Sequence, residues 1–155
     1  MYFQHQKTPE DTPSSDTITN SGFWPDIVMS DFIANRRIPT DYNDSANRDA
    51  LIKAMRIINI ELMNWKEKQQ GNGITDANDA GEVIDGKGSA AGLYISAVYD
   101  RAKATLLAHY ETLNRREEAD NLAKESKETS DRYLAESQFA VRAILGINTS
   151  SVKLI

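Results

Sequence analysis

The glycine-rich stretch at residues 81–89 comes closest to a phosphate-binding motif. Residues 81–87 (GEVIDGK) match the first seven positions of a P-loop, in which backbone N–H groups and a lysine hold phosphates. The eighth position must be Ser or Thr to bind magnesium, but Gly88 stands there and Ser89 comes one residue late. No convincing strand precedes Gly81, and two carboxylates lie in the turn. We therefore expect no nucleotide binding.

The same stretch overlaps the start of a calcium-loop pattern. Asp76, Asn78 and Gly81 fill the first, third and sixth positions of an EF-hand loop. The fifth position is Ala80, and the twelfth is Lys87, where a bidentate glutamate is required. We therefore expect no calcium site in this loop.

The remaining reactive side chains do not form a catalytic set. His5 and His109 are far apart in the sequence and have no nearby acid at metal-ligand spacing. The carboxylates lie in helical runs with basic neighbours, such as residues 115–118 (RREE), which are typical of solvated ion-pairing faces. No nucleophile is paired with a base. The sequence predicts a protein that is not an enzyme, needs no metal or other cofactor, and functions through contact.

The composition is that of one folded domain. The chain has 155 residues, of which 40% are hydrophobic, and no cysteine, which excludes disulfides and thiolate metal sites. No apolar stretch approaches the roughly 20 residues that cross a bilayer, and the N-terminus lacks signal-peptide order, so we expect no membrane association. A cytoplasmic or virion setting fits this composition.

The net charge of −5 argues against tight binding of nucleic acid. Nine basic and fourteen acidic residues lie in residues 1–88, whereas residues 89–155 carry nine of each. A protein that grips DNA phosphates normally has a basic stripe, and none is present. DNA near this protein is expected to pass by rather than to be held.

The elements that would organise such a contact protein are helices, above all in residues 93–146. Ile95, Tyr99, Ala102, Leu106, Tyr110 and Leu113 recur at helical spacing and predict one broad apolar face. Leu93, Ala97, Ala104 and Ala108 form a stripe of small residues on the opposite side, where a second helix could approach closely. A further helix, with Tyr133, Ala140 and Ile144 on one line, is expected to end in a left-handed cap at Gly146. Whether the two helices join or break near Asn114 or Asn121 is left open.

A second long helix is predicted before the glycine-rich loop. A short helix, capped by Ser30 or Asp31, precedes it and runs to Arg37. The long helix begins at Thr40, Asp41 or Ser45 and ends at Gly71, with Leu51, Met55, Ile58, Leu62 and Trp65 on its core face. Ile57 and Ile60 lie on its other side, which indicates either a helix covered on both sides or contact with a protein partner. Residues 71–92, with six of the eight glycines, predict a long mobile connection with a short extended piece at residues 82–84.

The two ends of the chain are candidate contact segments. Residues 1–22 have the composition of a flexible polar arm. Phe23 and Trp24 before Pro25 either close one end of the helical core or anchor a neighbouring subunit. Residues 147–155 have no helical period; they either add to another protein's sheet edge or groove, or form a frayed terminus. The proposed contact residues of this tail are Ile147, Val152, Leu154 and Ile155.

The order of these segments resembles a known family. FWPDI after a polar tail, a long helix, a loop with IDG, then LYISAVYDRAKATLLAHYE and DRYLAESQFAVRAILG, is similar to head-completion proteins of temperate contractile-tailed bacteriophages over residues 23–155. The resemblance implies an all-α connector subunit that forms a ring of about twelve copies. Such a ring lies under the portal, retains the packaged DNA and offers a surface to tail-terminator or neck proteins in the virion, after assembly in the host cytoplasm. It supplies no catalytic residues.

The resulting fold prediction is a small helical bundle with two to three long antiparallel helices, a glycine-rich loop and extended N- and C-terminal arms. Its segments are an arm at 1–22, a helical domain at 23–146 and a tail at 147–155. Two other classes stay open: another virion joint, such as a tail-completion or stopper protein, and a host-type helical adaptor or small helical enzyme. The partner bound, or a ligand-dependent shift in melting, would separate them.

Overall fold

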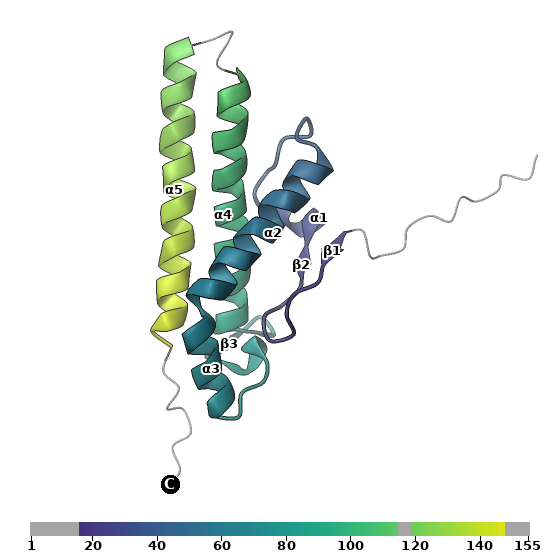
Figure 1. Ribbon diagram of the computed structural model, residues 1–155, viewed down its shortest axis with the longest axis vertical. Helices are drawn as coiled ribbons and strands as arrows, with labels where there is room; N and C mark the ends of the chain where they lie inside the picture. The colour runs from purple at the N-terminus through teal and green to yellow at the C-terminus, as the bar shows by residue number, and fades with distance from the viewer. Residues whose placement is uncertain (1–15, 115–118, 148–155) are drawn as a thin grey trace, which may run out of the picture.

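The computed structural model describes residues 16–114 and 119–147, so residues 1–15 and the predicted contact residues Val152, Leu154 and Ile155 lie outside it. The described chain is mostly helical, in agreement with the predicted class, and it also contains two small two-stranded sheets (Figure 1). The helices are α1 (Met29–Asn35), α2 (Asp44–Glu61), α3 (Met63–Gly71), α4 (Ser89–Asn114) and α5 (Ala119–Leu145), with a 3-10 turn at Ala77–Asp79. The strands are β1 (Thr17–Ile18), β2 (Ile27–Val28), β3 (Val83–Ile84) and β4 (Lys87–Gly88).

Helix α4 is the central element, and α5 lies antiparallel beside it (Figure 1). Helix α5 packs on the small-residue stripe of α4. The Ser137 hydroxyl donates to the Ala97 carbonyl at 2.7 Å, and the Ser130 hydroxyl donates to the Ala104 carbonyl at 3.0 Å. A neighbouring helix can approach the backbone this closely only where the side chains between them are small. The prediction that this stripe receives a second helix is confirmed.

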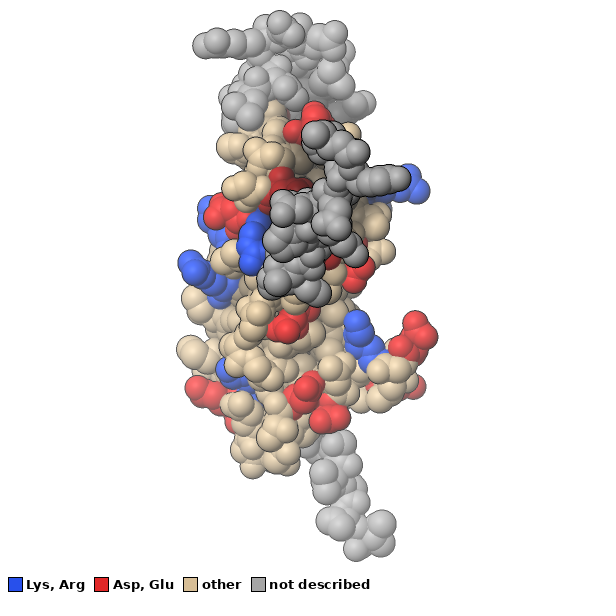
Figure 2. All heavy atoms as spheres, turned by 90° about the vertical axis from the view of Figure 1, so that its right-hand side faces the viewer, with Lys and Arg blue, Asp and Glu red and all other residues tan. Residues whose placement is uncertain are grey.

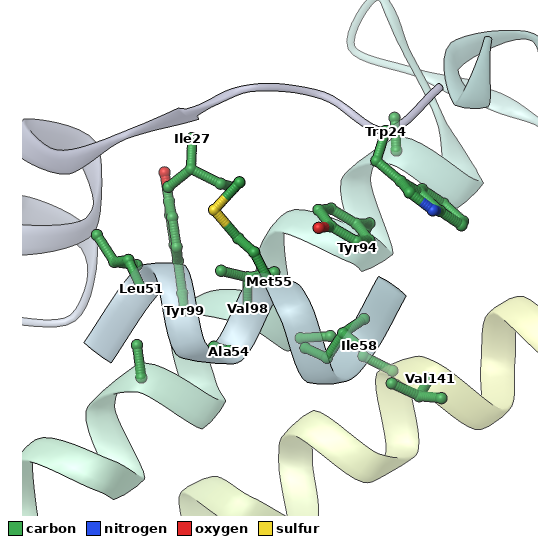
Figure 3. Packing of buried hydrophobic residues seen from close by; sticks show 14 of the residues in the cluster. Trp24, Ile27, Leu51, Ala54, Met55, Ile58, Tyr94, Val98, Tyr99 and Val141 are labelled. Carbon is green, nitrogen blue, oxygen red and sulfur yellow. The ribbon is translucent and has the colours of Figure 1, made fainter. Parts of the chain in front are cut away.

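The opposite face of α4 packs on the N-terminal half of the chain. Tyr99 contacts Phe32 of α1, with ring centroids 5.5 Å apart, and Tyr110 stacks on Tyr42 at 3.7 Å. Helix α2 crosses α4 nearby and buries Leu51, as predicted, and Figure 3 shows Leu51, Met55 and Ile58 of α2 among Ile27, Val98 and other core residues. The core therefore surrounds α4 from several sides.

The long helix that was predicted to begin at Thr40, Asp41 or Ser45 and to end at Gly71 is two helices, α2 and α3, with a bend between them. Leu62 has φ −97° and ψ 4°, which is outside helical geometry and separates α2 from α3. Backbone bonds continue across the bend, because Leu62 N–H donates to Ile58 O and Lys66 N–H donates to Leu62 O, both at 2.9 Å. The core face is preserved, since Leu62 is fully buried. The side chain that caps α2 is Asn43, which accepts from Ala46 N–H, and not one of the three expected residues.

The segment from Asp16 to Val28, called the N-terminal strap below, belongs to the folded body. Strands β1 and β2 pair antiparallel, and Ile18 is buried, so the body extends past the expected boundary at residue 22. Neither Ser30 nor Asp31 caps α1. The Asp16 carboxylate instead accepts from the Ser30 N–H at 2.9 Å and from its hydroxyl at 2.5 Å. The strap thus supplies the missing start of α1.

The connection between α3 and α4 is packed and structured. The extended piece predicted at residues 82–84 is the first strand of a hairpin, β3–β4, whose turn has positive φ at both Asp85 (51°) and Gly86 (73°). A Cβ at Gly88 would lie 2.1 Å from the Asn78 carbonyl oxygen, so only glycine fits there. The expected left-handed cap at Gly146 is wrong: Gly146 is not among the residues with positive φ. Gly146 N–H donates to Arg142 O at 3.1 Å, which continues helical bonding to the end of α5.

Candidate interaction surfaces

The predicted anchor residues Phe23 and Trp24 lie inside the subunit. Trp24 is 3% exposed and stacks between Tyr94, with centroids 4.7 Å apart, and Trp65 at 5.7 Å. Phe23 meets Trp24 edge to face at 5.0 Å. Burial of large aromatic rings in this geometry stabilises the subunit itself. Of the two interpretations of this motif, the geometry favours closure of the core, and Pro25, half-buried, borders the cluster.

A polar network fixes the strap above these rings. The Tyr94 hydroxyl donates to Asn59 Oδ1 at 2.6 Å and accepts from Asn20 Nδ2 at 2.9 Å. Asn59 Nδ2 donates back to Asn20 Oδ1 at 3.0 Å, and Asn20 Nδ2 also donates to the Pro25 carbonyl at 2.9 Å. Burial raises the pKa of Tyr94 to about 12, although both asparagine bonds oppose this shift. The network joins the strap, α2 and α4, while burial of the hydroxyl keeps Tyr94 un-ionised.

A charged cluster lies where α1 meets α4. Arg36 Nε donates to Asp100 Oδ1 at 2.7 Å, and the guanidinium also lies 5.5 Å from the centre of the Tyr99 ring. Burial raises the pKa of Asp100, and the bond from Arg36 opposes this. Lys103 is buried nearby; burial lowers its pKa, and its Nζ lies 3.5 Å from the Arg37 carbonyl oxygen. The ion pair connects the end of α1 with α4, so we assign it a structural role.

The predicted contact residues of α2 are only partly covered. Ile60 is 69% exposed, whereas Ile57 is half-buried. Ile60 lies about half a helical turn from the buried face that contains Leu51 and Ile58. An isoleucine directed away from the core is available to a partner.

Sequence reasoning missed several other exposed apolar side chains. Phe139 of α5 is 62% exposed, and Ile84 at the tip of the β3–β4 hairpin is 65% exposed. Val83, Met63 and Leu145 are also exposed. The signal for Phe139 was present, because on a helical wheel it lies about 120° from the line through Ala140 and Ile144 and so outside the buried face. Together with Ile60 of α2, these residues are spread over α2, α3, α5 and the hairpin. The described surface therefore offers more than one apolar contact.

Ile147, the first residue of the predicted C-terminal tail, is part of the folded body of the subunit. The Ile147 side chain is half-buried and packs against the core. Its carbonyl oxygen accepts from Trp65 Nε1 at 3.4 Å, which is a long hydrogen bond. Of the four tail residues predicted to make contacts, the three beyond Ile147 lie outside the described residues.

The described side chains were expected to hold no metal ion, and the surface to carry no basic stripe. Among the side chains that the structure describes, no three His, Asp or Glu residues are grouped to hold a metal ion. No helix in that part of the chain is long and apolar enough to cross a membrane. Figure 2 shows basic and acidic side chains interspersed on the face that it presents, without a basic stripe. The residues that only partly match the P-loop and calcium-loop patterns form the 3-10 turn and the β3–β4 hairpin described above.

Comparison with known proteins identifies the family. The model of the family described as phage head completion protein (GPL) matches residues 18–155. The chain is 32% identical over 139 residues, or 89% of its length and 91% of the relative, to a probable head completion/stabilization protein of Haemophilus phage HP1. No solved structure matches. The resemblance found in the sequence is thereby confirmed, and this chain belongs to the phage head completion protein family.

Proposed function

We propose that this protein is a connector subunit that binds beneath the portal of a DNA-filled phage head, forms a ring, retains the DNA and presents a surface for the tail. The observation that carries the proposal is the family match over residues 18–155. Membership of this family makes the chain a structural component of a virion. The ring, its location and its partners are the parts that need testing.

The exposed apolar residues support assembly into a ring. Ile60 on α2 and Phe139 on α5 are exposed on helices that both pack against α4, and each side chain is directed away from its own buried face. Contacts between two different surfaces of identical subunits are head-to-tail, and such contacts close into rings when the rotation allows. We expect neighbouring subunits to meet through such surfaces, with Ile60 and Ile57 on one side.

The tail after Ile147 is the proposed contact with the portal or with the next subunit. Val152, Leu154 and Ile155 supply its apolar side chains. Because Ile147 is packed against the core, deletion of residues 148–155 should leave the subunit folded while heads fail to join tails. A deletion variant that unfolds would place these residues in the core instead.

The charge of the chain fits a role near DNA without tight binding. The net charge is −5, and Figure 2 shows no continuous basic surface on the face it presents. The DNA phosphates therefore find few basic side chains to bind, and the DNA is free to move when it leaves the head. DNA retention would then result from closing the channel rather than from gripping the phosphates.

The decisive experiment adds the purified protein to DNA-filled heads that lack it. Nuclease protection of the genome and tail joining are then scored. Protection followed by joining supports the proposal, whereas leaky heads together with binding to isolated tails would assign the protein to the tail side. Absence of both effects with a folded protein would refute it.

Two matched substitutions locate the subunit contact. Ile60→Ser removes an exposed apolar side chain of α2, and Ile84→Ser removes one of similar exposure from the hairpin. Both should change the free energy of unfolding by no more than about 0.5 kcal/mol, because the side chains are in water. We expect Ile60→Ser to abolish ring formation on heads. Equal ring formation by wild type and Ile60→Ser would exclude this side chain from the contact.

A further inference from the structure

The β3–β4 hairpin exposes apolar and acidic side chains together. Val83 is 63% exposed and Ile84 is 65% exposed, and their neighbours Glu82 and Asp85 are exposed as well. Side chains alternate along a strand, so Glu82 and Ile84 share one face of the hairpin and lie about 6.6 Å apart along it. Among the described residues, Glu82 forms no ion pair. Such a face is suited to contact with a partner.

The hairpin is ordered before any partner binds it. The Ser89 N–H and hydroxyl both donate to the Glu82 carbonyl, at 2.8 and 2.7 Å, which ties the two strands together at their base. The turn has positive φ at both central residues, and such a turn matches the twist of a hairpin. Lys87 Cδ lies 4.0 Å from the place of a Cβ on Gly92, so the lysine stem follows the start of α4. An element held in this way loses little conformational freedom on binding.

A groove lies between the N-terminal strap and α2, which Figure 1 shows beside each other. Its volume is about 520 Å³, within the range of ligand-binding clefts. Ile18 and Met55 are buried in it, and Ile52 is half-buried. No acidic residue is among the described residues that line it, which are Thr17, Ile18, Thr19, Asn20, Ser21, Arg48, Ile52, Met55, Arg56 and Asn59. The groove thus combines an apolar floor with basic side chains.

Arg56 gives this groove a charge that complements the hairpin. Its side chain is exposed, and it forms no ion pair with any acidic residue that the structure describes. Ile52 precedes it by one helical turn, about 6 Å along α2. This spacing nearly equals that of Ile84 and Glu82 on the hairpin. With Ile84 on Ile52, the Glu82 carboxylate therefore meets the Arg56 guanidinium, and opposite charges at matching positions fix one register.

The hairpin that fits this groove belongs to a second copy of the chain. In the described subunit, no residue of the hairpin is among those that line its own groove. Ile60, the proposed contact residue of α2, lies four positions after Arg56 and therefore next to it on the surface of the helix. A hairpin bound in a neighbour's groove joins two different surfaces of identical chains, which is the head-to-tail contact of a ring.

We propose that the β3–β4 hairpin of one subunit binds in the strap–α2 groove of the next, with Ile84 on the floor beside Ile52 and Glu82 paired with Arg56. The contact rests on the ring of the proposed function, and it supplies the surface that meets the Ile60 side of α2. The groove exists only when the strap has docked on α2. Only a completely folded subunit therefore accepts a neighbour.

Charge reversal on either side of the contact tests the pairing, with ring formation on DNA-filled heads as the measurement. Glu82→Lys and Arg56→Glu each bring like charges together, so each should raise the concentration that half-saturates the heads by about tenfold or more. Asp79→Lys, in the 3-10 turn, and Lys68→Glu, on α3, make the same charge changes at exposed residues outside the contact. Both controls should assemble like wild type.

An equal mixture of Glu82→Lys and Arg56→Glu should form rings although neither does so alone. When the two variants alternate around the ring, every hairpin meets a groove of opposite charge, and this rescue requires that the two groups belong to different subunits. Wild-type rings that tolerate Glu82→Lys, or a mixture without rescue, would overturn the pairing and leave the proposed function standing. A wild type that forms no ring on heads would refute the proposed function itself.

Cysteine pairs locate the contact, since the natural chain has no cysteine. In Ile84→Cys/Thr19→Cys, one thiol lies on the hairpin and the other on the exposed strap side of the groove. Oxidation on heads should link its chains into a ladder that ends at the full ring. Ile84→Cys/Phe139→Cys, which uses an exposed residue of α5, should give few crosslinks. A ladder from the Phe139 pair, or products of the Thr19 pair that stop at dimers, would overturn the proposal. Unfolding in urea confirms that each variant is folded.

Discussion

Replacing Tyr94 with phenylalanine is expected to destabilise the subunit at neutral pH. The change removes the hydroxyl that joins Asn20 to Asn59. Asn20 Nδ2 keeps the Pro25 carbonyl as an acceptor, whereas Asn59 Oδ1 loses its donor in the network. A buried polar atom without a partner costs about 1–3 kcal/mol. Because Asn59 is only half-buried, the free energy of unfolding should fall by about 1 kcal/mol, the low end of that range.

The same substitution should alter the pH dependence with a definite sign. Burial raises the pKa of Tyr94 from 10.0 to about 12, so between these values the folded state holds a proton that the unfolded state has lost. Stability therefore falls as pH rises through this window, by about 2 kcal/mol at roughly pH 11.5 and about 2.7 kcal/mol above pH 12. Phenylalanine has no such proton. The deficit of the variant should shrink, and can reverse, in alkali.

Urea unfolding of both proteins at about pH 7, 9 and 11.5 measures this difference. The pKa of Tyr99 is also raised to about 12, but Tyr99 is present in both proteins and cancels. A difference in unfolding free energy that stays constant across the three pH values would refute the assignment of Tyr94 as a buried, un-ionised hydroxyl. A deficit near zero at pH 7 would refute the role of the network in holding the strap.

Three further substitutions test the core, each by urea unfolding. Gly88→Ala should cost about 1–3 kcal/mol or more, because its Cβ meets the Asn78 carbonyl, whereas Gly71→Ala has open space and should cost nothing. Trp24→Ala should cost about 3–5 kcal/mol; a variant of normal stability that fails to join heads would instead restore Trp24 as an anchor. Lys103→Met should unfold at an equal or higher urea concentration at neutral pH. It should also lack the rise in stability with pH just below 10.5, which follows from the lowered pKa of Lys103.

The helices of the core were predictable because their spacing is a local property of the sequence. Ala97 and Ala104 repeat at helical spacing with small side chains, and this pattern predicted that a second helix could approach α4 there. The structure shows that this helix is α5. The face of Leu51, Met55 and Ile58 was equally clear. The bend at Leu62 has no local signal, since no proline or glycine marks it.

The contacts of the strap were not predictable, because they join residues distant in the sequence. Asn20 and Tyr94 are 74 positions apart in the sequence. Asp16 caps α1 by accepting a hydrogen bond from Ser30, which lies 14 positions later. The polar composition of residues 16–22 suggested an arm, while its hydrogen bonds make it part of the body. The candidate site shows the same limit: Ile60 was identified from its place on a helix, whereas the exposure of Ile84 depends on how the hairpin packs.

The external cap on α1 has a consequence for the order in which the subunit folds. Helices α4 and α5 are neighbours in the sequence, so the contacts between them can form early. Helix α1 is only seven residues long and takes its cap from Asp16, so it is stable only after the strap has docked. We expect the strap and α1 to open and close as one unit, before global unfolding, and Asp16→Ala to accelerate hydrogen exchange in both while α4 remains protected.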